Sequence, residues 1–440
     1  MSLHISWVMP MIQVKDNSDV TKYQENPIVQ ELLDRDLSDL ANENFIIFPP
    51  QLQSSDDLDG ENYIFHQHNR HIRTGNIVGV MKRGAEEVRI HSRFYDSENE
   101  TDDFFIKYLL HQVLSMNVVR TKINIDSADS YYDLLAFLFP MYLNSAMEKG
   151  VYKEYVKRQY NDANVKGPIN IARHIKTNTP FMGRIAYDTR EFSFDNRLTQ
   201  LIRHTIEKLN AEYSYDFASD SLTKDNMKSI IHETPSYSRI ERFEVLSENV
   251  ANPVRHGYYE EYYLLQKLCI QILNEEKIGF GHEDDEIHGI IIDVAWLWEE
   301  YLNTLLSERF IHPENKNSRY GISLFSDIQR TVYPDFYSKD KRVVLDAKYK
   351  MLDNSEKGIN REDRYQIISY LHVLAAERAG LAYPSKWKSD YVHAGKLDGF
   401  GGSLFKLPLM IPQNVESYDE FVTVIQESEM SFTSSLIEIF

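Results

Sequence analysis

The chain has 440 residues, enough for about three domains, and its 42% apolar and 26% charged content is typical of soluble globular proteins. No apolar run reaches the roughly 18–20 residues that span a bilayer, and the N-terminus lacks an export-signal pattern. We therefore expect a cytoplasmic protein without membrane contact. The net charge of −19 argues against a protein that coats nucleic acid by bulk electrostatics, although DNA remains possible as a substrate. The single cysteine, Cys269, excludes an internal disulfide and a four-thiolate zinc site.

The sequence pattern divides the chain into three parts. Residues 1–125 combine short β-type runs with polar loops, and 76–94 is typical of a hairpin. Residues 126–250 are mainly helical in pattern, with amphipathic stretches over 131–149 and 197–209. We predict a multidomain α+β or α/β protein with a β-rich N-terminal module, a helical connector and a C-terminal α/β domain over 251–440.

The C-terminal part alternates helical and extended patterns. Helices are predicted over 257–274 and 294–306, and two β-type runs over 331–337 and 342–349 are joined by a polar tetrapeptide. A further helix is predicted over 362–378, ended by Gly380. The order helix, strand, strand, helix suggests a small α/β domain.

Two carboxylates and a lysine are predicted to converge at one end of the two β-type runs. Residues two apart on a strand share a face, so Asp346 and Lys348 point the same way. If the runs pair as a hairpin, Asp335 returns towards Asp346. Adjacent carboxylates either share a proton or bind a hard cation such as Mg²⁺. A metal-bound water is a good nucleophile, and Lys348 would hold that water or the charge that develops on a phosphoryl group.

A simpler interpretation is a salt-bridged hairpin, with Asp346 and Lys348 as an exposed ion pair worth less than ~1 kcal/mol. An acid-x-lysine triplet discriminates poorly, because such triplets also occur elsewhere in the chain. The preceding apolar run and the upstream Pro334-Asp335 distinguish this one. Together these residues resemble the PD-(D/E)xK nuclease motif.

Two neighbouring helices carry further candidates. Gln366 and Tyr370 are four residues apart and share a helix face. They resemble the QxxxY element of RecB-like nucleases, although an ordinary amphipathic helix explains the same spacing. Glu299 and Glu300 lie on the helix before the hairpin, where such nucleases place another metal-ligating acid. They flank the apolar stripe on either side, so periodicity does not choose between them.

Ordered motifs from about residue 75 to 375 resemble the McrC family. The family's LFExY element is similar to 297–301, which selects Glu299 as the additional acid, and its DAKYK string is found at 346–350. Residues 363–366 together with Tyr370 resemble the helix that follows this string in the family. Other similar segments are 150–155 (GLxxxY), 165–170 (a GRI-type turn with Pro168 for the arginine), 187–198 (YDExxxDxxxNRxL) and the hairpin 76–90, where 91–94 departs from a PKI-like end.

The resemblance implies a nuclease subunit of a McrBC-type, modification-dependent restriction system, or the related component of LlaJI-type systems. In that family the partner is a hexameric AAA+ GTPase, the McrB-type subunit, which recognises DNA. The N-terminal part of McrC enters the partner's pore and stimulates GTP hydrolysis, and the C-terminal PD-(D/E)xK domain cuts double-stranded, modified DNA with Mg²⁺, for which Mn²⁺ can substitute. This chain lacks a GxxxxGK[ST] sequence, so the GTP would be bound by the partner.

By the same resemblance, the site residues acquire roles. Asp335, Asp346 and Glu299 would ligate the metal. Lys348 would position water or stabilise charge. Gln366 and Tyr370 would support the site. Two other functions remain open, namely a catalytically silent adaptor that activates an AAA+ partner and a stand-alone RecB-like nuclease.

Overall fold

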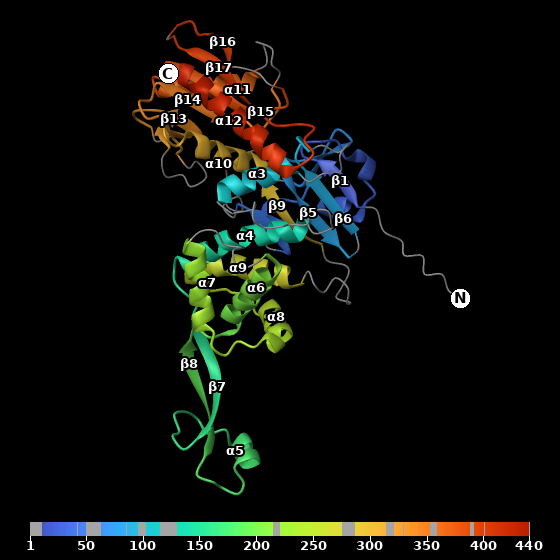
Figure 1. The fold of residues 1–440 in the computed structure, drawn as a ribbon, viewed down its shortest axis with the longest axis vertical. Helices are drawn as coiled ribbons and strands as arrows, with labels where there is room; N and C mark the ends of the chain where they lie inside the picture. Colours follow the sequence, from blue (N-terminus) through green and yellow to red (C-terminus); the bar gives the residue numbers. More distant parts are fainter. Residues whose placement is uncertain are drawn as a thin grey trace, which may run out of the picture. The chain divides into compact units, whose positions relative to one another are not determined.

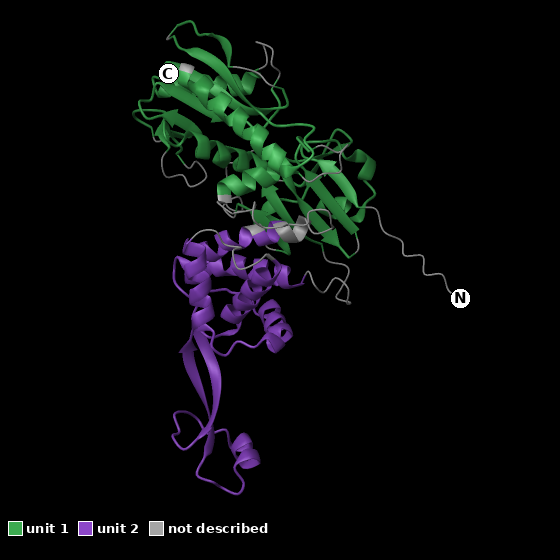
Figure 2. Ribbon diagram, in the orientation of Figure 1, with its two compact units in different colours: residues 1–115, 282–440 green, residues 116–281 purple. Residues whose placement is uncertain are grey.

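The structure is a computed structural model, and it describes residues 11–41, 43–49, 63–84, 86–95, 103–114, 130–213, 221–274, 287–313, 321–328, 330–352, 359–387, 391–399 and 401–439. It is a mixed α/β protein with several sheets (Figure 1), which confirms the coarse fold class predicted from the sequence. Two compact units divide the chain (Figure 2), one made of residues 1–115 and 282–440 and the other of residues 116–281.

The unit boundaries differ from the predicted divisions at 125 and 250. Strand β9 (His288–Asp293) pairs in parallel with β2 (Phe45–Phe48) and antiparallel with β5 (Ile77–Arg83). A strand from the C-terminal part therefore completes the N-terminal sheet, and the two parts form one unit. Pairing between segments about 200 residues apart leaves no local pattern, so it cannot be predicted from the sequence.

The N-terminal sheet has the strand order β1-β6-β5-β9-β2. The predicted hairpin over 76–94 is confirmed, because β5 pairs antiparallel with β6 (Glu86–His91) around Gly84, whose φ is 56°. The outer strand β1 (Ile12–Lys15) runs parallel to β6. Helices α1 (Pro27–Leu32) and α2 (Leu37–Ala41) bury apolar side chains in the same core, and β3 (Phe65–His68) and β4 (His71–Thr74) form a separate hairpin.

The second sheet of this unit has the order β10-β13-β14-β15-β17-β16. Strands β14 (Val343–Ala347), β15 (Arg378–Ser385) and β17 (Ser403–Met410) are parallel and largely buried, as expected for strands covered on both faces. Helix α11 (Arg361–Val373) connects β14 to β15. The remaining elements are β10 (Phe310–Ile311), β11 (Ile322–Ser323), β12 (Thr331–Val332), β13 (Phe336–Ser338), β16 (Val392–Lys396), α3 (Phe104–Leu114), α10 (Val294–Leu306) and α12 (Tyr418–Ile439).

Two predicted helices of this region have different outcomes. The helix over 294–306 is confirmed as α10, which Asp293 caps by accepting hydrogen bonds from the N–H groups of Ala295 and Trp296. The helix predicted over 362–378 ends earlier, at Val373, and Gly380 does not end it. Gly380 lies in β15, where a Cβ would come within 2.1 Å of the Phe405 ring. The glycine is explained by close packing between strands, not by helix capping.

The other unit is helical, with one long hairpin. Helices α4 (Ser130–Met147) and α6 (Arg197–Tyr213) confirm the two predicted amphipathic stretches, and α9 (Glu260–Asn274) packs against both. Antiparallel strands β7 (Glu154–Asp162) and β8 (Ile185–Ser193) form an arm that extends from the helices and carries α5 (Ile171–Thr177) at its far end (Figure 1). Helices α7 (Ser221–Glu233) and α8 (Arg242–Ala251) complete the unit. In the described part of the chain, no helix is both long and apolar enough to cross a bilayer.

Candidate active site

The β13–β14 pairing brings two predicted carboxylates together. Phe336 pairs with Leu345, and Tyr337 with Val344. Continuing this register by one residue places Asp335 across from Asp346. The N–H of Ala347 donates a 2.6 Å hydrogen bond to Oδ2 of Asp335, which fixes this carboxylate against the end of β14.

Lys348 connects the carboxylates to helix α11. Its Nζ lies 2.9 Å from Oδ2 of Asp346 and donates a 3.0 Å hydrogen bond to Oε1 of Gln366. Nε2 of Gln366 in turn donates a 3.1 Å hydrogen bond to the hydroxyl of Tyr370. The side chain of Asp346 is only 2% exposed and that of Lys348 22%, so this is no exposed ion pair on an ordinary hairpin. Four residues selected from the sequence form one continuous polar chain from β14 to α11.

Burial has the largest effect on the pKa values of the two carboxylates at this site. Burial, followed by the charge of Glu299, raises the pKa of Asp335 to about 7. Burial and the neighbouring Asp335 raise the pKa of Asp346 to about 7 as well. Burial alone would lower the pKa of Lys348, but the charges of Asp346 and Asp335 outweigh it and raise the pKa above its usual value. The two acids thus titrate as a pair at near-neutral pH beside a fixed positive charge.

This pair makes stability depend on pH in the metal-free protein. Its folded-state pKa is about 7, whereas an unfolded aspartate titrates near ~4. Between these values the folded chain binds more protons than the unfolded chain, so we expect stability to fall as pH rises through this window. Thermal unfolding in chelator across the window measures the slope. Asp346→Asn should flatten the slope, and an unchanged slope would contradict this reading of the pair.

Glu299, Glu300 and His312 form a second polar group next to Asp335. His312 follows β10, and Nε2 lies 3.7 Å from Oε1 of Glu299 and 3.5 Å from Oε1 of Glu300. Its Nδ1 lies 2.8 Å from the backbone carbonyl oxygen of Asp335. Burial opposes protonation, but the hydrogen bond to Glu300 leads the effects that raise the pKa of His312 to about 9. The imidazole of His312 therefore bridges α10, which carries Glu299, and the backbone of Asp335 just before β13.

His312 is absent from the residues predicted from the sequence. It is a lone histidine with no partner at a regular spacing, so no local signal distinguishes it. A second missed contact joins two segments that the motif comparison did select. Nζ of Lys350 lies 2.5 Å from Oδ2 of Asp363, in the first turn of α11. Lys348 and Lys350, two residues apart, therefore both hold α11 over the end of β14.

The donor set suits a hard cation in part. Oδ2 of Asp346 is buried and accepts no hydrogen bond from the described residues, and the ammonium of Lys348 lies 2.9 Å from it as an ion-pair partner. Carboxylate oxygens such as those of half-buried Asp335 and buried Asp346 are the kind of ligands that Mg²⁺ prefers. Within the described ranges, however, no group of three or more His, Cys, Asp or Glu side chains is arranged to hold a metal ion. The predicted set of Glu299 with the two aspartates therefore stays a prediction.

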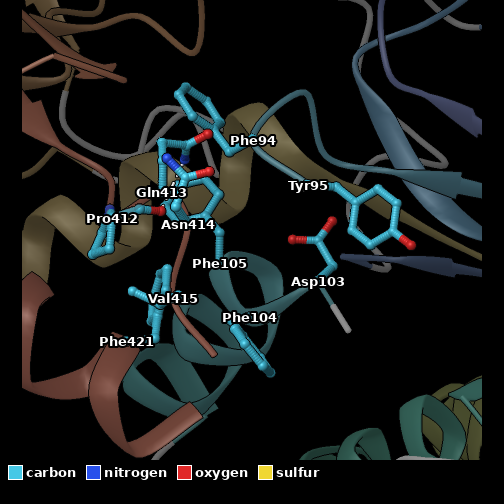
Figure 3. A pocket seen from close by; sticks show the side chains of 10 residues that line it. All are labelled: Phe94, Tyr95, Asp103, Phe104, Phe105, Pro412, Gln413, Asn414, Val415 and Phe421. Atoms are coloured by element: carbon cyan, nitrogen blue, oxygen red, sulfur yellow. Dashed lines mark hydrogen bonds between the residues drawn. The ribbon is translucent and has the colours of Figure 1, made fainter. Parts of the chain in front are cut away.

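A pocket in the same unit lies away from these side chains. Figure 3 shows its lining side chains, which come from α3, from the residues after β6, from the segment after β17 and from α12. None of the six predicted site residues lines this pocket. We therefore place the candidate site at the charged residues around Asp346 and not at this pocket. The lining residues are Phe94, Tyr95, Asp103, Phe104, Phe105, Pro412, Gln413, Asn414, Val415 and Phe421.

Half-buried Asp335 and buried Asp346 thus lie beside Lys348 at the end of β14, within a mixed α/β unit. The profile of the McrBC 5-methylcytosine restriction system component family matches residues 72–384, a span that includes all six predicted site residues. This span is well over half of the chain, so the chain belongs to that family. The resemblance predicted from the sequence is confirmed.

Two solved structures are similar at low identity. One is a chain from the half-complex of Thermococcus gammatolerans McrB AAA+ hexamers with bound McrC, with 16% identity, a TM-score of 0.46, and coverage of 98% of this chain and 100% of that chain. The other is from the Thermococcus gammatolerans McrBC complex, with 13% identity, a TM-score of 0.32, and coverage of 68% and 87%. No curated protein matches the chain. The family assignment rests on the matched span of the profile.

Proposed function

We propose that this chain is the DNA endonuclease subunit of a McrBC-like, GTP-dependent restriction complex that acts in the cytoplasm. The observation that carries the proposal is the pair of half-buried Asp335 and buried Asp346 beside Lys348 in a chain of this family. The β13–β14 hairpin, β15 and the flanking helices α10 and α11 would then form a PD-(D/E)xK nuclease domain. Membership of the restriction family makes double-stranded, modified DNA the proposed substrate.

The site residues divide the chemistry between them. Asp335, Asp346 and Glu299 would hold Mg²⁺, or Mn²⁺ in its place, and the bound ion would supply an activated water and neutralise phosphate charge. Lys348 would hold the charge that develops on the phosphoryl group, since its ammonium lies beside the same carboxylate. Gln366 accepts a hydrogen bond from that ammonium and restricts its position. Tyr370 accepts a hydrogen bond from Gln366 and restricts it in turn.

The arm formed by β7, β8 and the segment between them is a candidate surface for binding the partner. Its residues 154–193 contain seven Lys or Arg against four Asp or Glu, in a chain of net charge −19. Exposed apolar side chains gather near its end, which is typical of a protein-binding surface. From the family resemblance we expected the partner contact within the N-terminal module, residues 1–125, whereas this arm belongs to the helical unit. The exposed residues are Ile169, Ile171, Ile175, Phe181 and Met182.

Changing the end of the arm should weaken the partner interaction. Phe181 is 63% exposed and Met182 81% exposed, so Phe181→Ser with Met182→Ser should leave the fold intact. If the side chains of Phe181 and Met182 are buried in the complex, we expect affinity for the AAA+ partner to fall at least about tenfold, equivalent to ~1.4 kcal/mol. Stimulation of the partner's GTPase, titrated with each variant, gives the measurement. Phe243→Ser, 60% exposed on α8, is the matched control. Equal loss in the control, or none in the arm variant, would argue against this surface.

The proposed activity is tested by reconstitution. The full chain is combined with its AAA+ partner, GTP, Mg²⁺ and methylated or unmethylated DNA, and each component is omitted in turn. The proposal predicts cleavage only when the chain, the partner, GTP and Mg²⁺ are all present. Cleavage by the chain and Mg²⁺ alone would favour a stand-alone nuclease. Partner GTPase stimulation without any cleavage would favour the silent adaptor.

A further inference from the structure

A buried ion pair joins the strand ends of the N-terminal sheet. The carboxylate of Asp16, just after β1, is 0% exposed, and the side chain of Arg93, just after β6, is 9% exposed. Nε of Arg93 donates a 2.9 Å hydrogen bond to Oδ2 of Asp16, and Nη2 contacts the same oxygen. Nη2 also donates a 2.7 Å hydrogen bond to Oδ1 of Asn76, just before β5. One guanidinium thus ties together the ends of three strands.

The same guanidinium reaches the candidate active-site strand. Its Nη1 donates a 3.2 Å hydrogen bond to the backbone carbonyl of Tyr349, and the group lies 4.4 Å from the centre of the Tyr349 ring. Tyr349 is 6% exposed and directly follows Lys348. The N–H of Lys348 donates a 2.9 Å hydrogen bond to the carbonyl of Ala382 on β15. The backbone around Lys348 is therefore held from the neighbouring strand and from Arg93.

The arrangement also reaches the helix that carries Glu299. The backbone carbonyl of Asn76 accepts a 3.2 Å hydrogen bond from the N–H of Val294, the first residue of α10. The side chain of Asn76 accepts from Arg93 at the same time. The start of α10 and the end of β14 are thus both linked by hydrogen bonds to the Arg93 guanidinium, the first through Asn76 and the second through Tyr349.

We propose that Arg93 is a positioning residue for Lys348, which it holds through the backbone of Tyr349 at the distance required by the nuclease site. The catalytic consequence rests on the proposed function. A buried ion pair gives little net stability compared with apolar residues of the same volume, so its fixed directions are the distinctive feature. A planar guanidinium presents donors in set directions to Asp16, Asn76 and Tyr349 together. A lysine ammonium, a compact point charge, could pair with Asp16 but could not serve all three.

Arg93→Lys tests the proposal, with Arg83→Lys as control. Arg83 ends β5 in the same sheet, at the opposite end from Asn76, and pairs with Glu31 at 3.2 Å. In Arg93→Lys, amide hydrogen exchange over residues 343–352 should accelerate at least about tenfold. The kcat for cleavage in the full complex should fall about 10- to 100-fold, while the KM for DNA and partner GTPase stimulation stay at the wild-type values. The control should match the wild type in each measurement.

Each outcome decides a separate question. Wild-type exchange over 343–352 and wild-type kcat in Arg93→Lys would overturn the positioning role. If the wild-type complex cleaves no DNA, the proposed function fails, and the exchange measurement still tests the contact. If Arg93→Lys does not fold, Asn76→Ala removes one acceptor and leaves the ion pair. Faster exchange at 343–352 in that variant supports the role, and unchanged exchange contradicts it.

Discussion

Replacing Asp346 with asparagine should abolish DNA cleavage while the protein stays folded. The substitution conserves shape but removes the charge of a proposed metal ligand whose side chain is only 2% exposed. A ligand that neutralises charge in the transition state contributes at least as much as one oxyanion-hole donor, so we expect a loss of at least about 10²–10³-fold in rate. Cleavage by the full complex, measured at saturating Mg²⁺ and GTP, gives the comparison.

Two controls separate a catalytic defect from a damaged protein. Asp340→Asn changes an exposed acid in the turn of the same hairpin, where its carboxylate accepts hydrogen bonds from Ser338 and Arg342. This variant should cleave DNA at a rate close to wild type. Partner GTPase stimulation should be unchanged in both variants. Normal cleavage by Asp346→Asn would remove the nuclease assignment and leave the adaptor function.

Lys348→Met should reduce kcat by a similar factor for a different reason. Methionine keeps the length of the apolar stem and removes the ammonium that lies between Asp346 and Gln366. Without this charge, nothing in the polar chain would stabilise negative charge on the phosphoryl group, and we expect a loss of about 10²–10³-fold. Single-turnover cleavage isolates this effect from DNA binding, since the KM for DNA should change little.

Lys350→Met is the matched control for that substitution. Lys350 is in the same segment and forms a comparable ion pair with Asp363 on α11, at 2.5 Å. Its partner is outside the carboxylate pair, so its loss should affect the docking of α11 more than the chemistry. We expect a decrease in kcat of less than about tenfold for an interaction of this partly exposed kind. Equal defects in the two lysine variants would show that Lys348 acts through α11 and not on the reacting group.

The parts of the site that local pattern determines could be predicted from the sequence. The apolar run before Asp346 and the polar turn after β13 define a hairpin whose register needs only two-residue periodicity. The four-residue spacing of Gln366 and Tyr370 places both on one helix face. These rules depend on neighbours in the chain, which is why four of the six selected side chains are found in one polar chain.

The features that depend on distant pairing could not be predicted. His312 acquires its environment from α10 and from the backbone of Asp335, and neither contact leaves a spacing in the sequence. The same is true of β9, which completes a sheet begun at the other end of the chain. In the β7–β8 arm, the side chains of β7 alternate only between half-buried and exposed, so the sequence of this strand shows no regular alternation of apolar and polar residues. Tertiary contacts decide each of these cases.

We propose that Asp335 and Asp346 together bind one divalent ion. Crystals of the full chain soaked in Mn²⁺, with anomalous diffraction measured at the manganese edge, test it without any assay of activity. We expect a single strong peak within bonding distance of oxygens of both aspartates, which disappears in Asp346→Asn crystals. Crystals that show no peak there, or a peak bonded to other residues, would contradict it.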